Sequence, residues 1–464
     1  MGVRLLKCAV AAAALLSAPV ACSDDAGTDS AATSTPPTAP LGESSCFWSE
    51  PTTFDTNNTQ YPDTGAAYWF TSVRLPAGST LRLAGEYPHG RYMSFNAYGP
   101  DPATGEPGLP LDALADVEIV PDDGSINPFE PGADRRATER AYTVEVAGEQ
   151  RPADGERAAN TLYARSPASE GEATEAQLIH RVYVPDEGTE PHGGVALPEP
   201  TLETADGGTL TGQEACEALG AETALPDDLP ALSVDQYRQL VALGDPETHP
   251  AQDPPRWTRF FNTRQALLSS FWAGTTQEAQ IATLDATEQG GYYSNAHTDY
   301  VVAAVNRLLG PDPDGANLLV VRGLAPTTPR TADGEPTMGE GDVRYWSLCQ
   351  NESPVTTRGS GCLYDEQVPV DDEGRYTIVL SRPEDRPADA TADCGVAWLD
   401  WGPGDGVDRE EAGTLLLRHL LPSPDFEATI DRVEAPGEEE ATMGDYLPEM
   451  AYEAADAFSV PGCA

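Results

Sequence analysis

The sequence predicts a mainly β protein of two jelly-roll-like β-sandwich units, an internal duplication, joined by a helical segment. Three observations predict it: a set of motifs that occurs twice in the same order, strand-like runs in both halves, and helical periodicity in the middle. The two copies read Arg91-Tyr92-Met93-Ser94, Tyr142-Thr143-Val144, Arg151-Pro152-Ala153-Asp154 and Leu178-Ile179-His180-Arg181, then Arg344-Tyr345-Trp346-Ser347, Tyr376-Thr377-Ile378, Arg386-Pro387-Ala388-Asp389 and Leu416-Leu417-Arg418. Four ordered matches at similar spacing indicate duplication rather than chance.

Residues 46–222 are expected to form the first sandwich. Short runs rich in β-branched and aromatic residues alternate with Gly, Pro and Asp turns, which is typical of strands. The expected strands are 68–75, 79–84, 92–98, 117–120, 142–146, 161–165 and 178–184. In a strand that opens at Arg91, side chains alternate, so Met93 and Phe95 share its face while Tyr92, Ser94 and Asn96 lie on the other.

Residues 223–312 are expected to be helical. Ser233 and Gln236 match a capping box, and Gly244 ends that segment. Apolar residues between 257 and 274 recur at helical spacing, and so do those between 300 and 310. The aromatic stripe in 257–274 is interpreted as core; the alternative is the wall of a ligand cavity.

Residues 313–433 return to strand-like runs and are expected to form the second sandwich. The expected strands are 318–322, 343–348, 375–380, 396–399 and 415–420. Residues 434–464 are acidic and lack periodicity, so an irregular tail on the surface is expected.

The first 21 residues have the features of a signal peptide. Arg4 and Lys7 precede an apolar run from Ala9 to Ala21 that is too short to span a membrane. Cys22 follows a small residue, as at a bacterial lipoprotein cleavage site, so its thiol is expected to carry lipid. Pro19 departs from that pattern, which leaves plain secretion open. Residues 22–45 are predicted to be a disordered tether.

Charge and composition exclude several functions. The chain has 76 acidic and 27 basic residues, a formal net charge of −49, so nucleic acid is not an expected partner. Lys7 is the only lysine, which excludes Schiff-base chemistry and a phosphate-loop lysine in the mature chain. Histidine spacing predicts no metal site, and no cofactor is expected. The acidic loop from Asp400 to Glu411 leaves calcium as an alternative to a solvated turn.

Six cysteines follow the tether, an even number that predicts disulfides in an oxidising compartment. Cys349 and Cys362 bracket a short loop and form the firmest predicted pair. The other candidates are Cys46 with Cys216 and Cys394 with Cys463, although six cysteines allow 15 connectivities.

The candidate ligand-binding residues are His89, Arg91 and Asn127, expected near the mouth of a cleft between the sandwiches. Arginine holds anionic groups by paired hydrogen bonds. The competing interpretation makes Arg91 a scaffold ion pair, which the recurrence of arginine at 344 favours. Arg181 and Arg418 are open to the same two interpretations.

The second half resembles a bacterial domain of unknown function, DUF twelve-fourteen. The resemblance rests on Trp346-Ser347, Gly374 with Thr377-Ile378, Trp398-Leu399 and Leu415 to Arg418; Ala397 stands where that family has Asn. The chain from 46 to 448 also resembles uncharacterised exported bacterial proteins, through Pro88 to Phe95, Gly124 to Phe129 and Gly341 to Cys349. These resemblances imply two jelly-roll-like sandwiches and no known activity.

Two classes of function remain. The first is an exported, lipid-anchored envelope protein of unknown activity, a ligand-binding or structural module. Its small-molecule ligand or envelope partner is expected between the sandwiches and the helical segment. The second is an extracytoplasmic hydrolase or metal-dependent enzyme with a site between the two sandwiches. An aromatic cleft without a nucleophile and base favours the first, and convergent polar groups favour the second.

Overall fold

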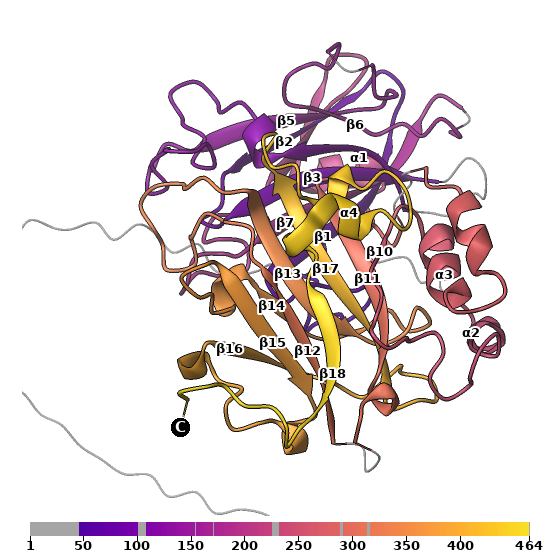
Figure 1. The fold of residues 1–464 in the computed structure, drawn as a ribbon. Coiled ribbons are helices and arrows are strands. Elements are labelled where there is room, and N and C mark those ends of the chain that lie inside the picture. The colour runs from indigo at the N-terminus through magenta and orange to yellow at the C-terminus, as the bar shows by residue number, and fades with distance from the viewer. Residues whose placement is uncertain are drawn as a thin grey trace, which may run out of the picture. The chain divides into compact units, whose positions relative to one another are not determined.

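The computed structural model describes residues 46–100, 108–153, 155–169, 171–224, 232–287, 291–312 and 316–463. The expected signal peptide, the tether and Cys22 lie outside the described residues. The structure is mainly β, as predicted, and its strands form four sheets (Figure 1).

The first half contains two of the sheets. The four-stranded sheet, called here the inner first sheet, has the order β1 (Ala66–Leu75), β7 (Thr174–Tyr183), β3 (Tyr92–Gly99), β4 (Leu109–Ala115). The five-stranded sheet, called the outer first sheet, has the order β6 (Thr161–Tyr163), β5 (Ala141–Ala147), β2 (Thr80–Glu86), β8 (Glu199–Glu203), β9 (Thr209–Thr211). Helix α1 (Gly212–Leu219) follows β9.

The second half contains the other two. The five-stranded sheet, called here the inner second sheet, has the order β10 (Thr258–Arg259), β11 (Thr298–Asn306), β17 (Ala412–Pro422), β13 (Val343–Asn351), β14 (Gly359–Tyr364). The four-stranded sheet, called the outer second sheet, has the order β16 (Val396–Asp400), β15 (Arg375–Ser381), β12 (Asn317–Leu324), β18 (Glu449–Ala454). Helix α4 (Glu439–Met443) precedes β18.

The two halves have the same strand order. If β11 to β18 are counted as the first to eighth strands of their half, both halves show the orders 1-7-3-4 and 6-5-2-8. The pairing of the fifth and sixth strands is parallel in both, while the other pairings are antiparallel. The repeated Arg-Tyr motifs begin β3 and β13, and the repeated Tyr-Thr motifs lie on β5 and β15.

Three hydrophobic cores place the sheets in layers. One core lies between the outer and inner first sheets and includes Leu83 of β2 and Phe95 of β3. A second lies between the inner and outer second sheets and includes Val301 of β11 and Val321 of β12. A third cluster joins the two inner sheets through Tyr183 and other residues. The inner sheets therefore face each other, with an outer sheet behind each.

In the segment 300–310, where a helix was predicted, residues 300–306 belong to strand β11 and residues 307–309 form a 3-10 turn. Val301, Ala303 and Val305 of β11 pack into the second core, while its other face also carries apolar residues. Because both faces are apolar, the sequence shows no alternation of apolar and polar residues that would indicate a strand. Its apolar residues also satisfy the i, i+4 spacing of a helix.

Other boundaries also differ from those predicted. The capping box at Ser233 and Gln236 begins α2 (Val234–Val241), as predicted, but in 257–274 only α3 (Thr263–Trp272) is helical. Residues 117–120 were expected to form a strand, but residues 116–118 form a 3-10 turn. The C-terminal segment is not wholly irregular: β18 pairs with β12 and buries Met450 and Tyr452 on one face.

The disulfides are Cys46–Cys216, Cys349–Cys362 and Cys394–Cys463, which confirms the predicted pairings. The first clamps the N-terminal end of the described chain to α1, the second links β13 to β14, and the third ties the C-terminal segment to the loop before β16.

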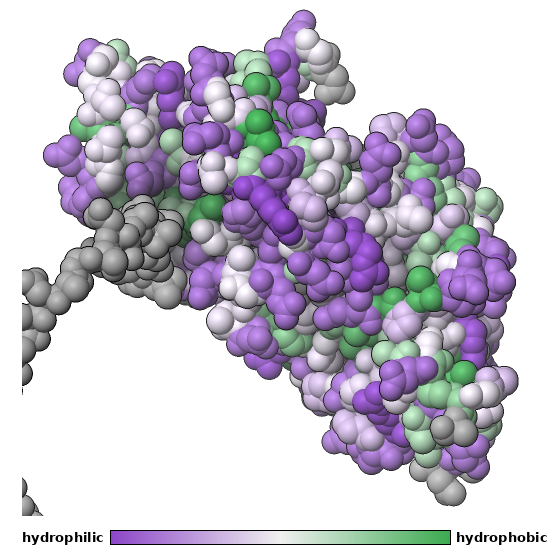
Figure 2. Space-filling view, turned by 90° about the vertical axis from the view of Figure 1, so that its left-hand side faces the viewer, coloured by the Kyte–Doolittle hydropathy of each residue, from purple (hydrophilic) through white to green (hydrophobic). Residues whose placement is uncertain are grey.

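Hydrophilic residues predominate on the molecular face in Figure 2, where hydrophobic residues form small separate patches. This agrees with the acidic composition. In the described part of the chain, no helix is both long and apolar enough to cross a membrane.

Candidate functional site

A cavity of about 180 Å³ lies between the two inner sheets, beside helices α2 and α3. Strands β1 and β7 form one wall, and β11 and β17 form the other. Tyr237 of α2 and Phe271 of α3 lie at its helical side, and two loops contribute Tyr61 and Tyr292. This is the region between the sandwiches and the helical segment where a binding protein was expected to hold its ligand.

The walls are aromatic because the strands bordering the cavity carry apolar side chains on both faces. One face of β11 packs into the second core, and the other supplies Tyr300, Val302 and Ala304 to the cavity. The aromatic lining consists of Tyr61, Tyr68, Phe70, Tyr183, Tyr237, Phe260, Phe271, Tyr292, Tyr293 and Tyr300. Such walls suit an apolar or aromatic ligand, with hydroxyl groups available to orient it.

The tyrosine hydroxyls in this region are neutral at pH 7. Burial raises the pKa of Tyr292 to about 12, and burial is also the main cause that raises the pKa of Tyr300. The rings therefore offer hydrogen-bond donors and aromatic faces, and they add no negative charge beside the arginines of the cavity.

Arg181 of β7 and Arg418 of β17 hold the same place in the two halves. Both line the cavity, and each is only 3% exposed. Nη2 of Arg181 donates to the carbonyl oxygen of Tyr293, and Nη2 of Arg418 donates to that of Tyr61, at 2.6 Å in both cases. The repeated motif thus places two buried guanidinium groups at matching positions on either side of the cavity.

Asp63 and Asn295 also hold the same place in the two halves. Asp63 lies three residues before β1 begins, and Asn295 lies three residues before β11 begins. Oδ1 of each accepts the backbone N–H of the residue two positions further on, Gly65 and His297 respectively. One half therefore carries a carboxylate where the other carries an amide.

This difference changes the surroundings of the two arginines. Nη1 of Arg418 lies 3.3 Å from Oδ2 of Asp63, so that arginine has a counterion. Arg181 forms no ion pair with a carboxylate of the described residues. Its Nη2 donates to the hydroxyl of Tyr98 at 2.7 Å, and its Nη1 is buried with no hydrogen-bond partner there.

A third arginine, Arg409, lines the helical side of the cavity with its own partner. Nε of Arg409 donates to Oδ2 of Asp405 at 2.9 Å, and the hydroxyl of Tyr237 donates to the same carboxylate at 3.0 Å. The backbone amides of residues 407–409 also donate to Asp405. Burial acts to raise the pKa of Asp405, but the backbone amides of Arg409 and Val407 and the Arg409 guanidinium outweigh it, and the pKa is lowered.

Two loops that line the cavity hold side chains in the left-handed backbone region. Gln60 and Tyr61 have φ of 61° and 55°, and Tyr292 and Tyr293 have φ of 53° and 54°. Bulky residues rarely adopt this conformation, which the surrounding structure must stabilise. The strained pairs occur at equivalent places in the two halves and direct tyrosines to the cavity.

The three candidate residues taken from the sequence lie in internal polar contacts and do not line the cavity. Arg91 is fully buried, with Nη1 2.5 Å from Asp365 Oδ1, and it also donates to Glu366 and to Thr331. Asn127 donates to the carbonyl oxygens of Asp116 and Ile119 and accepts from a backbone N–H. Arg91 and Asn127 therefore do not lie at the mouth of a cleft as expected, because their polar side-chain atoms form hydrogen bonds within the protein.

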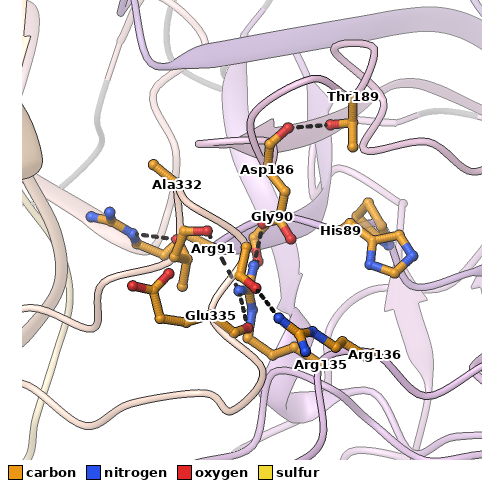
Figure 3. Close-up of polar contacts among 12 residues, drawn as sticks. His89, Gly90, Arg91, Arg135, Arg136, Asp186, Thr189, Ala332 and Glu335 are labelled. Atoms are coloured by element: carbon orange, nitrogen blue, oxygen red, sulfur yellow. Dashed lines mark hydrogen bonds and ion pairs between the residues drawn. The ribbon is translucent and has the colours of Figure 1, made fainter.

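His89 lies beside a second buried cluster, shown in Figure 3. Nη1 of Arg140 lies 2.8 Å from its Nε2, and burial, with Arg140 and Arg135, lowers the pKa of His89 to about 4. Arg135 pairs with Asp186 and donates to carbonyl oxygens of the 331–335 segment. This cluster ties the first half to a loop of the second.

The acidic loop from Asp400 to Glu411 does not gather its carboxylates around a common point in the described structure. Asp405 binds Arg409, Asp408 binds Arg238 at 2.7 Å, and Glu411 binds Arg382 at 2.7 Å. These ion pairs favour a structural role for the loop.

Two clusters of possible metal-ligand atoms lie elsewhere among the described residues. Each contains a disulfide-bonded cysteine pair, and sulfurs in a disulfide cannot act as thiolate ligands.

Arg181 and Arg418 stand out in the sequence as a repeated pair, but the difference between their surroundings was not predicted. The signal is present: Tyr61-Pro62-Asp63 stands seven residues before Tyr68, and Tyr293-Ser294-Asn295 stands seven residues before Tyr300. Aligning the two halves at these tyrosines would reveal the change from Asp to Asn. Without the strand pairing, nothing connects that change to arginines more than 100 residues away.

No protein-family model matches the chain, and no curated protein matches it. Among solved structures it is similar to an uncharacterised protein from Burkholderia cenocepacia, with 12% identity, coverage of 87% of this chain and 80% of that chain, and a TM-score of 0.43. It is also similar to the VPA0106 protein from Vibrio parahaemolyticus, with 11% identity, coverage of 84% and 89%, and a TM-score of 0.36. Similarity at this level carries no functional argument, and the resemblance to DUF twelve-fourteen stays a prediction.

Proposed function

We propose that this protein is an exported, lipid-anchored binding protein that takes up a small, mainly apolar molecule in the cavity between its inner sheets. The proposal rests on the cavity itself, whose described lining includes seven tyrosines and three phenylalanines. A volume of about 180 Å³ exceeds that of the ~150 Å³ cavity that accommodates benzene. Buried aromatic clefts with few polar groups are typical of small-molecule sites.

The lining favours binding over hydrolysis. Among the described residues that line the cavity there is no His, Cys, Glu or Lys, and its one carboxylate, Asp405, is held by Arg409 and by backbone amides. A hydrolase needs a nucleophile or an activated water with a base beside it.

Export is supported by the sequence and by the cysteines. The apolar run before Cys22 is typical of a lipoprotein leader. The three disulfides are of a kind that persists in oxidising compartments. We also propose that the two halves arose by duplication of one jelly-roll-like sandwich unit, because their strand orders are the same.

A neutral fluorophore tests the binding proposal. N-phenyl-1-naphthylamine should fluoresce more strongly on binding the wild-type protein. Ser270 of α3 lines the cavity, so Ser270→Trp should fill part of it and weaken binding by about tenfold or more, ~1.4 kcal/mol or more, while Ser270→Ala should bind as the wild type does. Equal binding by both variants, with unchanged melting temperatures, would place the fluorophore elsewhere and contradict the proposal.

A further inference from the structure

The cavity is positively charged although the protein is strongly acidic. The whole chain has 76 acidic and 27 basic residues, whereas the described lining has three arginines and one aspartate. Arg409 is balanced by Asp405, and Arg418 is balanced by Asp63 behind the lining. One positive charge, that of Arg181, is left over.

The guanidinium group of Arg181 is buried among aromatic rings and is held in place by hydrogen bonds. Arg181 is 3% exposed, and its Cζ lies 5.7 Å from the ring centres of Tyr68 and of Tyr98. Its Nη2 has two neutral acceptors, the Tyr98 hydroxyl and the Tyr293 carbonyl, while its Nη1 has no partner among the described residues. A buried, unpaired guanidinium is costly, so an anion that reaches it gains a strong, charge-assisted interaction.

The other half of the protein shows what such an anion does. Asp63 supplies a carboxylate to Arg418, and the equivalent residue, Asn295, cannot supply one to Arg181. Resting on the binding function proposed above, we propose that the ligand is a small monocarboxylate with an aromatic or aliphatic body. Its carboxylate pairs with Arg181 as Asp63 pairs with Arg418.

The charge count selects a monoanion. A ligand with one negative charge neutralises Arg181, while a dianion such as a phosphate monoester would bring a second buried charge with no free partner in the described lining. The tyrosine and phenylalanine walls receive the uncharged body, which loses contact with water on entry.

Calorimetric titration with 3-phenylpropanoate and with its neutral amide, 3-phenylpropanamide, tests this assignment. The wild-type protein should bind the carboxylate at least about tenfold more tightly than the amide. Asn295→Asp gives Arg181 an internal carboxylate in the geometry of the other half, and it retains the oxygen that accepts the N–H of His297. This variant should lose the preference for the carboxylate, bind the amide as the wild type does, and melt at the same or a higher temperature.

A control separates a local from a general effect of charge. Gln280→Glu adds one negative charge at an exposed position outside the cavity lining and should keep the preference for the carboxylate. Loss of preference in both variants would overturn the assignment, and so would a wild-type protein that binds the two molecules equally, although binding itself would then stand. If the wild type binds neither molecule at millimolar concentration, the carboxylate assignment fails. If it also fails to bind the neutral fluorophore, the proposed function fails with it.

Discussion

Arg91 in the first half donates from Nη1 to both carboxylate oxygens of Asp365 in the second half, at 2.5 and 2.6 Å. The relationship is reciprocal, since Nη1 of Arg344 in the second half lies 3.3 Å from Oδ1 of Asp116 in the first. Each aspartate follows the fourth strand of its own half and also accepts a backbone N–H from the third strand of that half. Two crossed, buried ion pairs therefore hold the inner sheets together.

The first prediction concerns the stability that these pairs provide. Arg91→Ala leaves the buried carboxylate of Asp365 without its ion-pair partner and should lower the free energy of unfolding by about 3–5 kcal/mol. The control is Arg322→Ala, whose partner Glu453 lies 2.9 Å away at a half-exposed position, and it should cost about 0–1 kcal/mol. Urea denaturation measures both. Equal losses would show that Arg91 is not a scaffold residue.

The second prediction ranks the disulfides. Cys46–Cys216 closes a loop with a sequence separation of 170, whereas Cys349–Cys362 closes one of 13. In the chain-entropy model, replacing both cysteines by serine should cost about 5 kcal/mol for the first pair and about 3 kcal/mol for the second. Thermal melting of the two double variants checks the order, and the reverse order would refute the entropic account.

The third prediction concerns acid sensitivity. His419 of β17 is buried, and desolvation lowers its pKa to about 3, below the usual 6.5. The folded state therefore binds fewer protons than the unfolded state between these values. The contribution of His419 to the free energy of unfolding is therefore fully present above about pH 6.5 and is lost as the pH falls toward 3. The loss from this one group is at most about 1.4 kcal/mol per pH unit. His419→Gln stays neutral and should show a shallower decline in denaturation midpoint between pH 6.5 and 4. A variant with the wild-type slope would exclude His419 as a source.

The fourth prediction concerns the anchor. If Cys22 carries lipid, Cys22→Ser should release the protein from the membrane fraction into the medium and abolish labelling by a radioactive fatty acid. The matched control is Cys8→Ser, directly before the apolar run, which should leave both anchoring and labelling unchanged. A native protein found free, beginning at Cys22 with an unmodified amine, would contradict lipid anchoring.

The sequence was sufficient wherever the ends of an element are marked. Strands β3 and β5 were predicted because short runs rich in β-branched and aromatic residues stand between turn residues, and α2 because Ser233 and Gln236 form its capping box. Strand β11 was mistaken for a helix because both its faces are apolar, one toward a core and one toward the cavity. Strand β18 was missed because its polar face is acidic, like the segment around it.

A cavity lies where the sequence led us to expect a ligand, between the sandwiches and the helical segment. Phe271, part of the aromatic stripe that was interpreted as core, lines this cavity. The polar residues chosen, such as Arg91, turned out to stabilise the scaffold. The informative contrast between Asp63 and Asn295 depends on which arginine each loop meets, and only the folded chain brings them together.

A crystal structure of the protein with 3-phenylpropanoate would show directly whether the cavity binds a carboxylate at Arg181. Electron density for the ligand is expected between β7, β11 and α3, with the ring among the tyrosines and the carboxylate about 2.7–2.9 Å from a nitrogen of Arg181. A cavity that contains only ordered water at saturating ligand concentration, or a ligand bound at another place on the protein, would contradict this proposal.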